Sequence, residues 1–379
     1  MQMPYFPTLL GAVIVFLPSF GCRPQGLAVQ HLNSYNFNAR MEKSLFSKEE
    51  ELAKHVVVII NHNSDASEEI GQYYAKKRHI PAANVFSIGV PTTEAIAPVT
   101  FYNSVIVPLK AFLKKNRNSI DYIVTTKGDP LTVNGFSADA TIAAMDLLQP
   151  SIFTPKFQMN FHPNPYFGKD VPFSHKKFGI YLVDRLAGYS VSDVKKLVDH
   201  SIEARPEKGT FFFQESPTRT HQTYGALQNT MVDAYNYLTD HGYKSTLTDF
   251  RHFLTIPDRC EGYVTWGSNH GFFDEKQYSA VKYYPGALAE TYVSTSARTL
   301  SGAVPGQSEI GPLIRSGVTG VKGYVSEPYT LALCRADILF ERYVNGFNLA
   351  ESFYAASPVI EWKDVVIGDP LCAPYSVGK

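Results

Sequence analysis

The sequence predicts an α/β fold in which a mainly parallel sheet is flanked by helices. The first observation is a set of apolar, β-branched runs, clearest at 56–60, that show no polar alternation. Such runs are typical of strands buried on both faces. The second observation is that stretches of helical length separate these runs, which favours βαβ units and a parallel sheet. A chain of 379 residues with 44% hydrophobic residues can bury one large core or two smaller ones.

The expected elements alternate from residue 55 onward. The first helix follows Ser64 and Asp65, either of which can cap it, and a later helix begins at Ser190 with Asp193 three residues on. Residues 150–177 show no clear period and are expected to form a long covering loop. The expected strands are 56–60, 85–88, 121–126, 179–183, 210–213, 262–266, 290–294 and 318–325. The first expected helix contains Ile70, Tyr73, Tyr74 and Lys77, and the others are expected at 103–115, 138–148, 190–202, 226–241, 307–316, 335–343 and 348–356.

The N-terminal residues have the character of a targeting segment. The apolar stretch 9–17 has signal-peptide length, although residues 1–8 contain no Lys or Arg. Cleavage near Gly26 and Ala28, or lipidation of Cys22, would release or tether the mature chain. We therefore expect an exported protein of the periplasm, cell envelope or extracellular space. The expected organisation is a signal peptide or lipoprotein signal at 1–28, a linker at 29–50, and an α/β domain at 51–379 with possible subdomains 51–185 and 186–379.

Charge and cysteine content exclude several classes of partner. Lys plus Arg equals Asp plus Glu, 35 against 35, so no global field favours nucleic acid. A membrane is expected to be contacted only through a lipid on Cys22. The remaining cysteines, Cys260, Cys334 and Cys372, match no zinc spacing and can form one disulfide at most. No metal and no cofactor is expected.

Polar side chains follow several of the expected strands. Asn269 and His270 follow the strand at 262–266, and Ser296 and Arg298 follow the strand at 290–294. In open α/β sheets, ligands bind beyond the carboxyl ends of the strands. His270 suits a general base or a loop-closing hydrogen bond, and Ser296 suits a nucleophile or a backbone cap. Asn269 and Arg298 are candidates for substrate binding, Arg298 through a carboxylate or phosphate.

Two acidic residues lie at further strand ends. Asp129 belongs to the first of two Gly-Asp-Pro-Leu tetrapeptides, at 128–131 and 368–371, and Glu327 precedes Pro328. Each is a candidate acid for orienting a group at the edge, or a residue that stabilises a turn. Asp369, in the second tetrapeptide, is expected to be structural. We expect His270, Ser296 and Arg298 on one edge, with Asp129 or Glu327 nearby.

From 55 to 375 the chain resembles an uncharacterised family of exported bacterial proteins. More remotely, the chain is similar to gingipain-type peptidases of the caspase-like fold. The similarity lies in the order of a strand followed by His270-Gly271, a next strand, a Gly-rich strand and a Gly-Asp-Pro ending. That resemblance implies a histidine base and a cysteine nucleophile, but the nucleophile position falls near Ser296 or Ala297, where no cysteine occurs. The family resemblance is carried by 263–269, 285–291, 294–299, 317–324, 348–353 and 368–371.

The resemblance leaves two functions open. One is a caspase-like, peptidase-type hydrolase with an altered nucleophile, or a catalytically silent relative of such an enzyme. The other is a cell-envelope binding or scaffolding protein that recognises a peptide or glycan through the loop 150–177 and the strand ends. An open pocket that joins His270 to a hydroxyl and an acid favours the enzyme. A sequestered His270 favours the binding protein.

Overall fold

The computed structural model describes residues 50–116, 119–158, 161–248, 251–360 and 362–376. The expected signal segment 1–28, Cys22 and the linker up to residue 49 lie outside the described residues, so export and lipidation stay predictions. Within the described ranges, no helix has both the length and the apolar character needed to cross a membrane.

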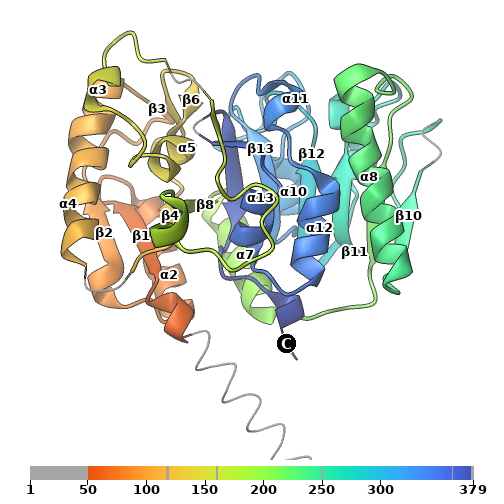
Figure 1. Cartoon of the computed structure of the whole chain (residues 1–379), viewed down its shortest axis with the longest axis horizontal. Helices are drawn as coiled ribbons and strands as arrows, with labels where there is room; N and C mark the ends of the chain where they lie inside the picture. The colour runs from red at the N-terminus through yellow and green to blue at the C-terminus, as the bar shows by residue number, and fades with distance from the viewer. Residues whose placement is uncertain (1–49, 117–118, 159–160, 249–250, 361, 377–379) are drawn as a thin grey trace, which may run out of the picture. The chain divides into compact units, whose positions relative to one another are not determined.

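A ten-stranded sheet forms the centre of the molecule and contains strands from before and after residue 185 (Figure 1). Neighbouring strands pair in parallel from β10 to β13 and from β8 to β2, whereas β15 pairs antiparallel with β13. The predicted α/β class with a mainly parallel sheet is confirmed. In spatial order the strands are β10 (Ser245–Leu247), β9 (Thr210–Gln214), β11 (Cys260–Thr265), β12 (Tyr283–Thr291), β13 (Gly320–Tyr324), β15 (Asp364–Gly368), β8 (Leu182–Leu186), β4 (Tyr122–Thr126), β1 (Val56–Asn61) and β2 (Val85–Ile88).

Helices cover the sheet in two groups. α2 packs against α7, and α12 packs against both α8 and α13; Figure 1 shows α8 and α12 side by side in front of the sheet. Both α7 and α13 begin with a capping box, Ser190 with Asp193 and Asn348 with Glu351, so two otherwise unpaired N-terminal groups are satisfied at each helix. The main helices are α2 (Asp65–Lys77), α4 (Val107–Lys115), α5 (Ala138–Ala143), α7 (Val191–Glu203), α8 (Gln222–Asp240), α12 (Ala336–Val344) and α13 (Leu349–Ala355).

Short elements extend the domain at its margins. A three-stranded sheet has the order β3 (Ala95–Ile96), β5 (Thr132–Val133) and β6 (Phe136–Ser137). β7 (His162–Pro163) pairs with β14 (Val359–Ile360). The remaining short helices are α3 (Pro98–Phe101), α6 (His175–Phe178), α9 (Glu275–Ser279), α10 (Gly311–Arg315) and α11 (Tyr329–Ala332).

Two predicted strands are displaced along the sequence. β8 spans Leu182–Leu186 rather than 179–183, because the charged residues Asp184 and Arg185 are accommodated inside the sheet. β12 spans Tyr283–Thr291 rather than 290–294, because the small residues Gly286, Ala287 and Ala289 fit a strand that is closely packed on both faces. The helix expected at 307–316 is limited to α10.

The loop 150–177 covers part of the core with aromatic side chains. Phe153 and Phe157 stack with ring centroids 5.2 Å apart, and Tyr166 meets Phe173 edge to face at 5.2 Å. All four side chains are buried. Most of the aromatic content of this loop therefore stabilises the domain.

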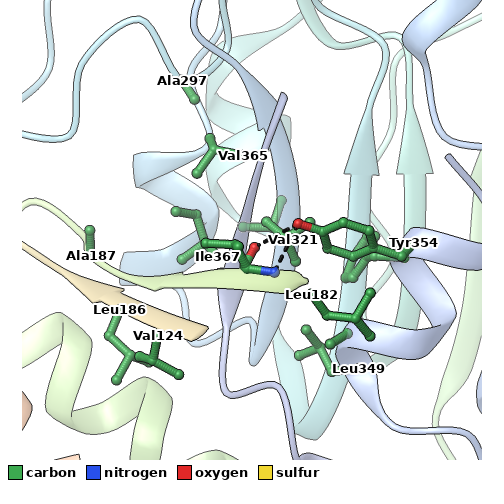
Figure 2. Close-up of a cluster of buried hydrophobic side chains, with 14 of the residues drawn as sticks. Val124, Leu182, Leu186, Ala187, Ala297, Val321, Leu349, Tyr354, Val365 and Ile367 are labelled. Carbon is green, nitrogen blue, oxygen red and sulfur yellow. Dashed lines mark hydrogen bonds between the residues drawn. The ribbon is translucent and has the colours of Figure 1, made fainter. Parts of the chain in front are cut away.

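The core is continuous across the seam between β8 and β15 (Figure 2). Here the hydroxyl of Tyr354, from α13, accepts a hydrogen bond from Val183 N at 2.9 Å and donates one to Val183 O at 3.1 Å. A buried backbone group without a partner is costly, and the Tyr354 hydroxyl satisfies both polar backbone groups of Val183, next to Asp184 and Arg185, which pair with β15. Ile367 and Val365, on β15, pack around the same seam.

Candidate functional site

Loops after β4, β11, β12 and β13 meet at one edge of the sheet. β11, β12 and β13 are parallel neighbours and end at Thr265, Thr291 and Tyr324. Lys127, directly after β4, reaches the loop after β12, where its Nζ donates to Leu300 O at 2.8 Å. We call this the carboxyl edge.

His270 reaches the edge through a 3-10 turn after β11, but its ring is buried. Only 3% of the residue is exposed, and the ring lies edge to face against Phe253, with centroids 5.3 Å apart. The Nδ1 atom accepts a hydrogen bond from Phe272 N at 3.0 Å. Burial is the main influence on the pKa of His270 and lowers it, so the neutral form is favoured.

The hydrogen bond at Nδ1 limits what His270 can do. A neutral imidazole that accepts at Nδ1 carries its proton on Nε2. That Nε2 atom is buried and has no hydrogen-bond partner in the described part of the chain. Both ring nitrogens are therefore poorly placed to take a proton from a neighbouring hydroxyl.

Ser296 is completely buried and caps the neighbouring strand. Its Oγ accepts a hydrogen bond from Tyr324 N, the last residue of β13, at 3.2 Å. Its carbonyl accepts from Ile310 N at 2.9 Å. Across the described ranges, no hydrogen bond joins Ser296 to His270. The two residues share the carboxyl edge but face different neighbours.

Half-buried neutral groups link the loops after β11 and β12. Asn269 Nδ2 donates to Tyr292 O at 2.7 Å, and its Oδ1 accepts from Gln307 Nε2 at 3.3 Å. Gln307 Oε1 in turn accepts from Thr295 Oγ1 at 2.8 Å. Gly267 allows this close approach, because a Cβ there would lie 2.5 Å from Ser308 Oγ. Asn269, Thr295, Gln307, Ser308 and Ser268 form what we call the polar cluster.

Arg298 organises the loop that follows β12. Its Nη1 donates to Thr295 O at 3.0 Å and Gln307 O at 2.8 Å, and its Nη2 donates to Val304 O at 2.7 Å. Nη2 also lies 3.0 Å from Glu309 Oε1. These contacts occupy both terminal nitrogens of the guanidinium and hold the loop in one shape, whereas Nε has no hydrogen-bond partner among the described residues.

Asp129 stabilises the turn after β4. Its Oδ2 accepts hydrogen bonds from Thr126 N at 2.7 Å and Thr126 Oγ1 at 3.1 Å. Burial raises its pKa to about 7, opposed mainly by the Arg185 guanidinium. Arg185 also donates to Asp129 O at 3.1 Å. The Asp129 carboxyl is therefore buried beneath the carboxyl edge and has a pKa close to neutral pH.

Glu327 is exposed and lies in the loop after β13. Its Oε1 accepts a hydrogen bond from Tyr329 N at 2.9 Å. The preceding Ser326 donates to Gly135 O at 2.8 Å, which joins this loop to the β5–β6 turn. In the described ranges neither Glu327 nor Asp129 hydrogen-bonds to His270.

The second tetrapeptide lies at the opposite edge, since Gly368 pairs with Gly320 at the beginning of β13. Asp369 there is fully buried, and its carboxylate accepts from Tyr74 OH at 2.8 Å and from Arg78 Nε at 2.6 Å. These contacts agree with the structural role expected for Asp369.

The thiols do not supply a nucleophile at the edge. Cys260, Cys334 and Cys372 are free and buried. Burial raises the pKa of Cys260 to about 12 and that of Cys372 to about 12, and it also raises the pKa of Cys334. A thiol held neutral in this way is a poor nucleophile.

Sequence reasoning missed the buried charged groups inside the sheet. Glu290 and Lys322 are cross-strand partners on β12 and β13 and are both fully buried. Glu290 Oε1 accepts from Tyr324 OH at 2.7 Å, and burial raises its pKa to about 8. Lys322 Nζ contacts Asp364 Oδ2 at 2.9 Å and Ser357 Oγ at 2.6 Å. Charged letters inside apolar runs, such as Lys322 between Val and Gly, were the signal that could have revealed them.

No cluster of three or more His, Cys, Asp or Glu side chains with the arrangement of a metal site occurs in the ranges that the structure describes. No family model matches the chain, and no curated protein matches it. One solved structure that the chain is similar to is titled "Structure of Protease", with a TM-score of 0.45 and 12% sequence identity. That match covers 85% of this chain and 78% of the other. The fold and edge define an α/β protein with a polar, largely self-bonded carboxyl edge.

Proposed function

We propose that this chain is a catalytically silent relative of the caspase-like peptidases that acts as a binding protein. The observation that carries the proposal is the arrangement of His270 and Ser296. The histidine ring is buried against Phe253, and the Ser296 hydroxyl is buried against the end of β13. The caspase-like assignment rests on the order of elements along the chain. β11 is followed by the His-Gly pair, β12 is the next strand, β13 is the Gly-rich strand, and the Gly-Asp-Pro ending follows β15.

Chemistry explains why this arrangement supports binding rather than cleavage. A serine hydroxyl attacks a carbonyl only when a base lies within hydrogen-bond reach, about 2.6–3.2 Å, of its proton. His270 has its Nδ1 lone pair occupied by Phe272 N–H, and Ser296 accepts from Tyr324 N–H. Hydrolysis with an altered nucleophile would require both loops to rearrange.

The accessible groups of the edge suit a neutral ligand. The polar cluster offers amide and hydroxyl groups, and its members are half-buried. Such groups recognise a peptide backbone or a glycan through hydrogen bonds between neutral groups, with little contribution from charge. We place the protein outside the cytoplasm, with Cys22 as its candidate anchor, and N-terminal sequencing of envelope protein tests that placement.

The absence of catalytic activity is tested on the purified protein with a fluorophosphonate probe and an iodoacetamide probe. A mixed peptide library is also incubated with the protein and analysed by mass spectrometry. We expect no labelling within residues 50–376 of the folded protein and no new peptide termini, because the described part of the chain contains no activated nucleophile. His270→Ala and Ser296→Ala should behave like the parent, with Thr295→Ala as the matched edge control. Turnover by the parent that His270→Ala abolishes would instead establish a hydrolase with an altered nucleophile.

A further inference from the structure

An apolar groove lies beside the three-stranded sheet, away from His270 and the polar cluster. It is lined by residues 95–99, the turn 134–135 and Pro155, it is open to solvent, and its volume is about 510 Å³. None of the lining residues is charged. The dimensions and lining fall within the range of ligand-binding sites in proteins.

The floor of this groove includes the free side of an edge strand. Among the described strands β3 pairs with β5 alone, in parallel, with Ala95 opposite Thr132 and Ile96 opposite Val133. Thr132 N donates to Glu94 O. Because alternate residues of a strand face the same neighbour, the backbone N–H of Ile96 also faces β5 in this register. The N–H groups of Ala95 and Ala97 face the other side and have no hydrogen-bond partner in the described ranges. Both alanines are exposed.

A partly exposed aromatic surface adjoins the groove at Gly135, with Phe161 and Tyr329 exposed and Trp362 half-buried. Gly135 O accepts hydrogen bonds from Ser326 Oγ at 2.8 Å and Lys363 Nζ at 2.9 Å. Beyond these two residues lie Tyr329 and Trp362, with ring centroids 6.4 Å apart, and Phe161 lies 4.9 Å from Trp362. We call these three rings the aromatic platform. Figure 1 places β3, β6 and α11, where Tyr329 begins the helix, along the same upper edge.

Tyr329 is held in an unfavourable backbone conformation. Its φ is +52°, a region that bulky residues rarely adopt, and 64% of the residue is exposed, more than any other large apolar side chain described. Backbone strain of this kind persists where the surrounding structure requires it and concentrates at ligand sites. The Glu327 carboxylate stabilises the strained turn by accepting from Tyr329 N.

We propose that the groove binds an extended peptide, which adds to β3 as a further strand and places an apolar side chain on the aromatic platform. Donors on alternate residues of a strand, about 6.7 Å apart, match the regularly spaced carbonyls of another extended peptide. The lining is uncharged and mainly aliphatic, with Asn134 as its one polar side chain, so it suits apolar side chains better than the many hydroxyls of a sugar. The inference rests on the proposed function in one respect, namely that this chain binds peptides.

Ala97 allows the donor to be removed with little change to the fold. Its φ of −69° and ψ of 140° are compatible with proline, which lacks the backbone N–H. The probe is a ten-residue peptide of alternating Val and Thr, blocked at both ends and labelled with fluorescein, and binding is followed by fluorescence anisotropy. We expect Ala97→Pro to weaken binding about tenfold, the effect of losing one useful hydrogen bond. Ala97→Ser keeps the N–H and should bind like the parent.

A second pair of variants tests the platform independently. Tyr329→Gly removes the ring and suits the positive φ, so its folding is not at risk, and it should weaken binding about tenfold. Tyr329→Phe keeps the ring and should retain binding. Equal affinity of the parent, Ala97→Pro and Tyr329→Gly would overturn the proposal, as would binding of chitohexaose with no binding of the peptide. Mass spectrometry of the recovered probe separates the two claims: a cleaved probe contradicts catalytic silence, whereas an intact probe with no effect of the variants contradicts the groove alone.

Discussion

The ion pair between Arg185 and Asp139 should make one of the largest single contributions to stability. Arg185, in β8, donates from Nε to Asp139 Oδ2 at 2.7 Å and from Nη2 to Oδ1 at 2.6 Å, and both side chains are 2% exposed. The same guanidinium donates to Asp129 O at 3.1 Å and Pro130 O at 2.7 Å. It therefore joins β8 to α5 and to the turn after β4. The perturbation is Arg185→Met, which keeps much of the volume.

The magnitude follows from what the substitution leaves behind. Removing one partner of a buried pair costs about 3–5 kcal/mol, because the Asp139 carboxylate remains buried without its cation. The two carbonyls that lose a donor add about 1 kcal/mol each. The sum of about 5–7 kcal/mol is comparable to the whole stability of many domains, about 5–15 kcal/mol. Adding Asp139→Leu removes the orphaned charge, so the double variant should be about 3 kcal/mol more stable than Arg185→Met.

Urea unfolding followed by far-UV circular dichroism gives the free energy of unfolding for each variant. Lys195→Met is the matched control, because Lys195 pairs with Glu69 at the surface, where such pairs contribute less than about 1 kcal/mol. A free energy of unfolding for Arg185→Met within about 1 kcal/mol of the parent would refute this contribution of the ion pair. A double variant no more stable than the single one would refute it as well.

Two further predictions concern groups that burial keeps neutral. Cys260, Cys334 and Cys372 should not react with a thiol-specific disulfide reagent in the folded protein and should react fully in urea; rapid reaction under native conditions would contradict their burial. Asp129 has a pKa raised to about 7, so its stabilising contribution is complete below about pH 4 and is lost as the pH rises through 7. Between pH 5 and pH 8 the melting temperature should therefore fall more for the parent than for Asp129→Asn, and equal falls would count against the raised pKa.

The sequence was sufficient for the class of fold because its strands are buried on both faces. Val56 to Ile60 form a strand in almost the expected place, and the strand at 85–88 matches the expected bounds. Prediction was poorer where tertiary contacts override local pattern. Arg185 lies inside β8 because Asp139, 46 residues earlier, pairs with it. The apolar run before Gly368 is visible in the sequence, but nothing local shows that it crosses the sheet in the direction opposite to β13.

The candidate site shows the same limit at the level of side chains. Topology brings the loops that contain His270, Ser296 and Asp129 to one edge, and strand ends predict that much. The direction of each side chain depends on distant partners: Phe253 receives the ring of His270, and Tyr324 N–H binds the hydroxyl of Ser296. The catalytic and substrate-binding roles of these residues stay predictions. The aromatic platform was missed because Phe161, Tyr329 and Trp362 are far apart in sequence and share no motif.

The position of β15 also determines when the domain can be completed during synthesis. β15, at Asp364–Gly368, lies between β8 and β13 and is the last of the ten sheet strands along the described sequence. Nine strands of the main sheet are therefore made before the strand that joins them. Until it arrives, β8 and β13 each present an unpaired edge, the kind of surface on which chains aggregate. Ribosomal pausing or premature termination just before residue 364 would leave two separate half-sheets, and such a product should depend on holdase chaperones to remain in solution.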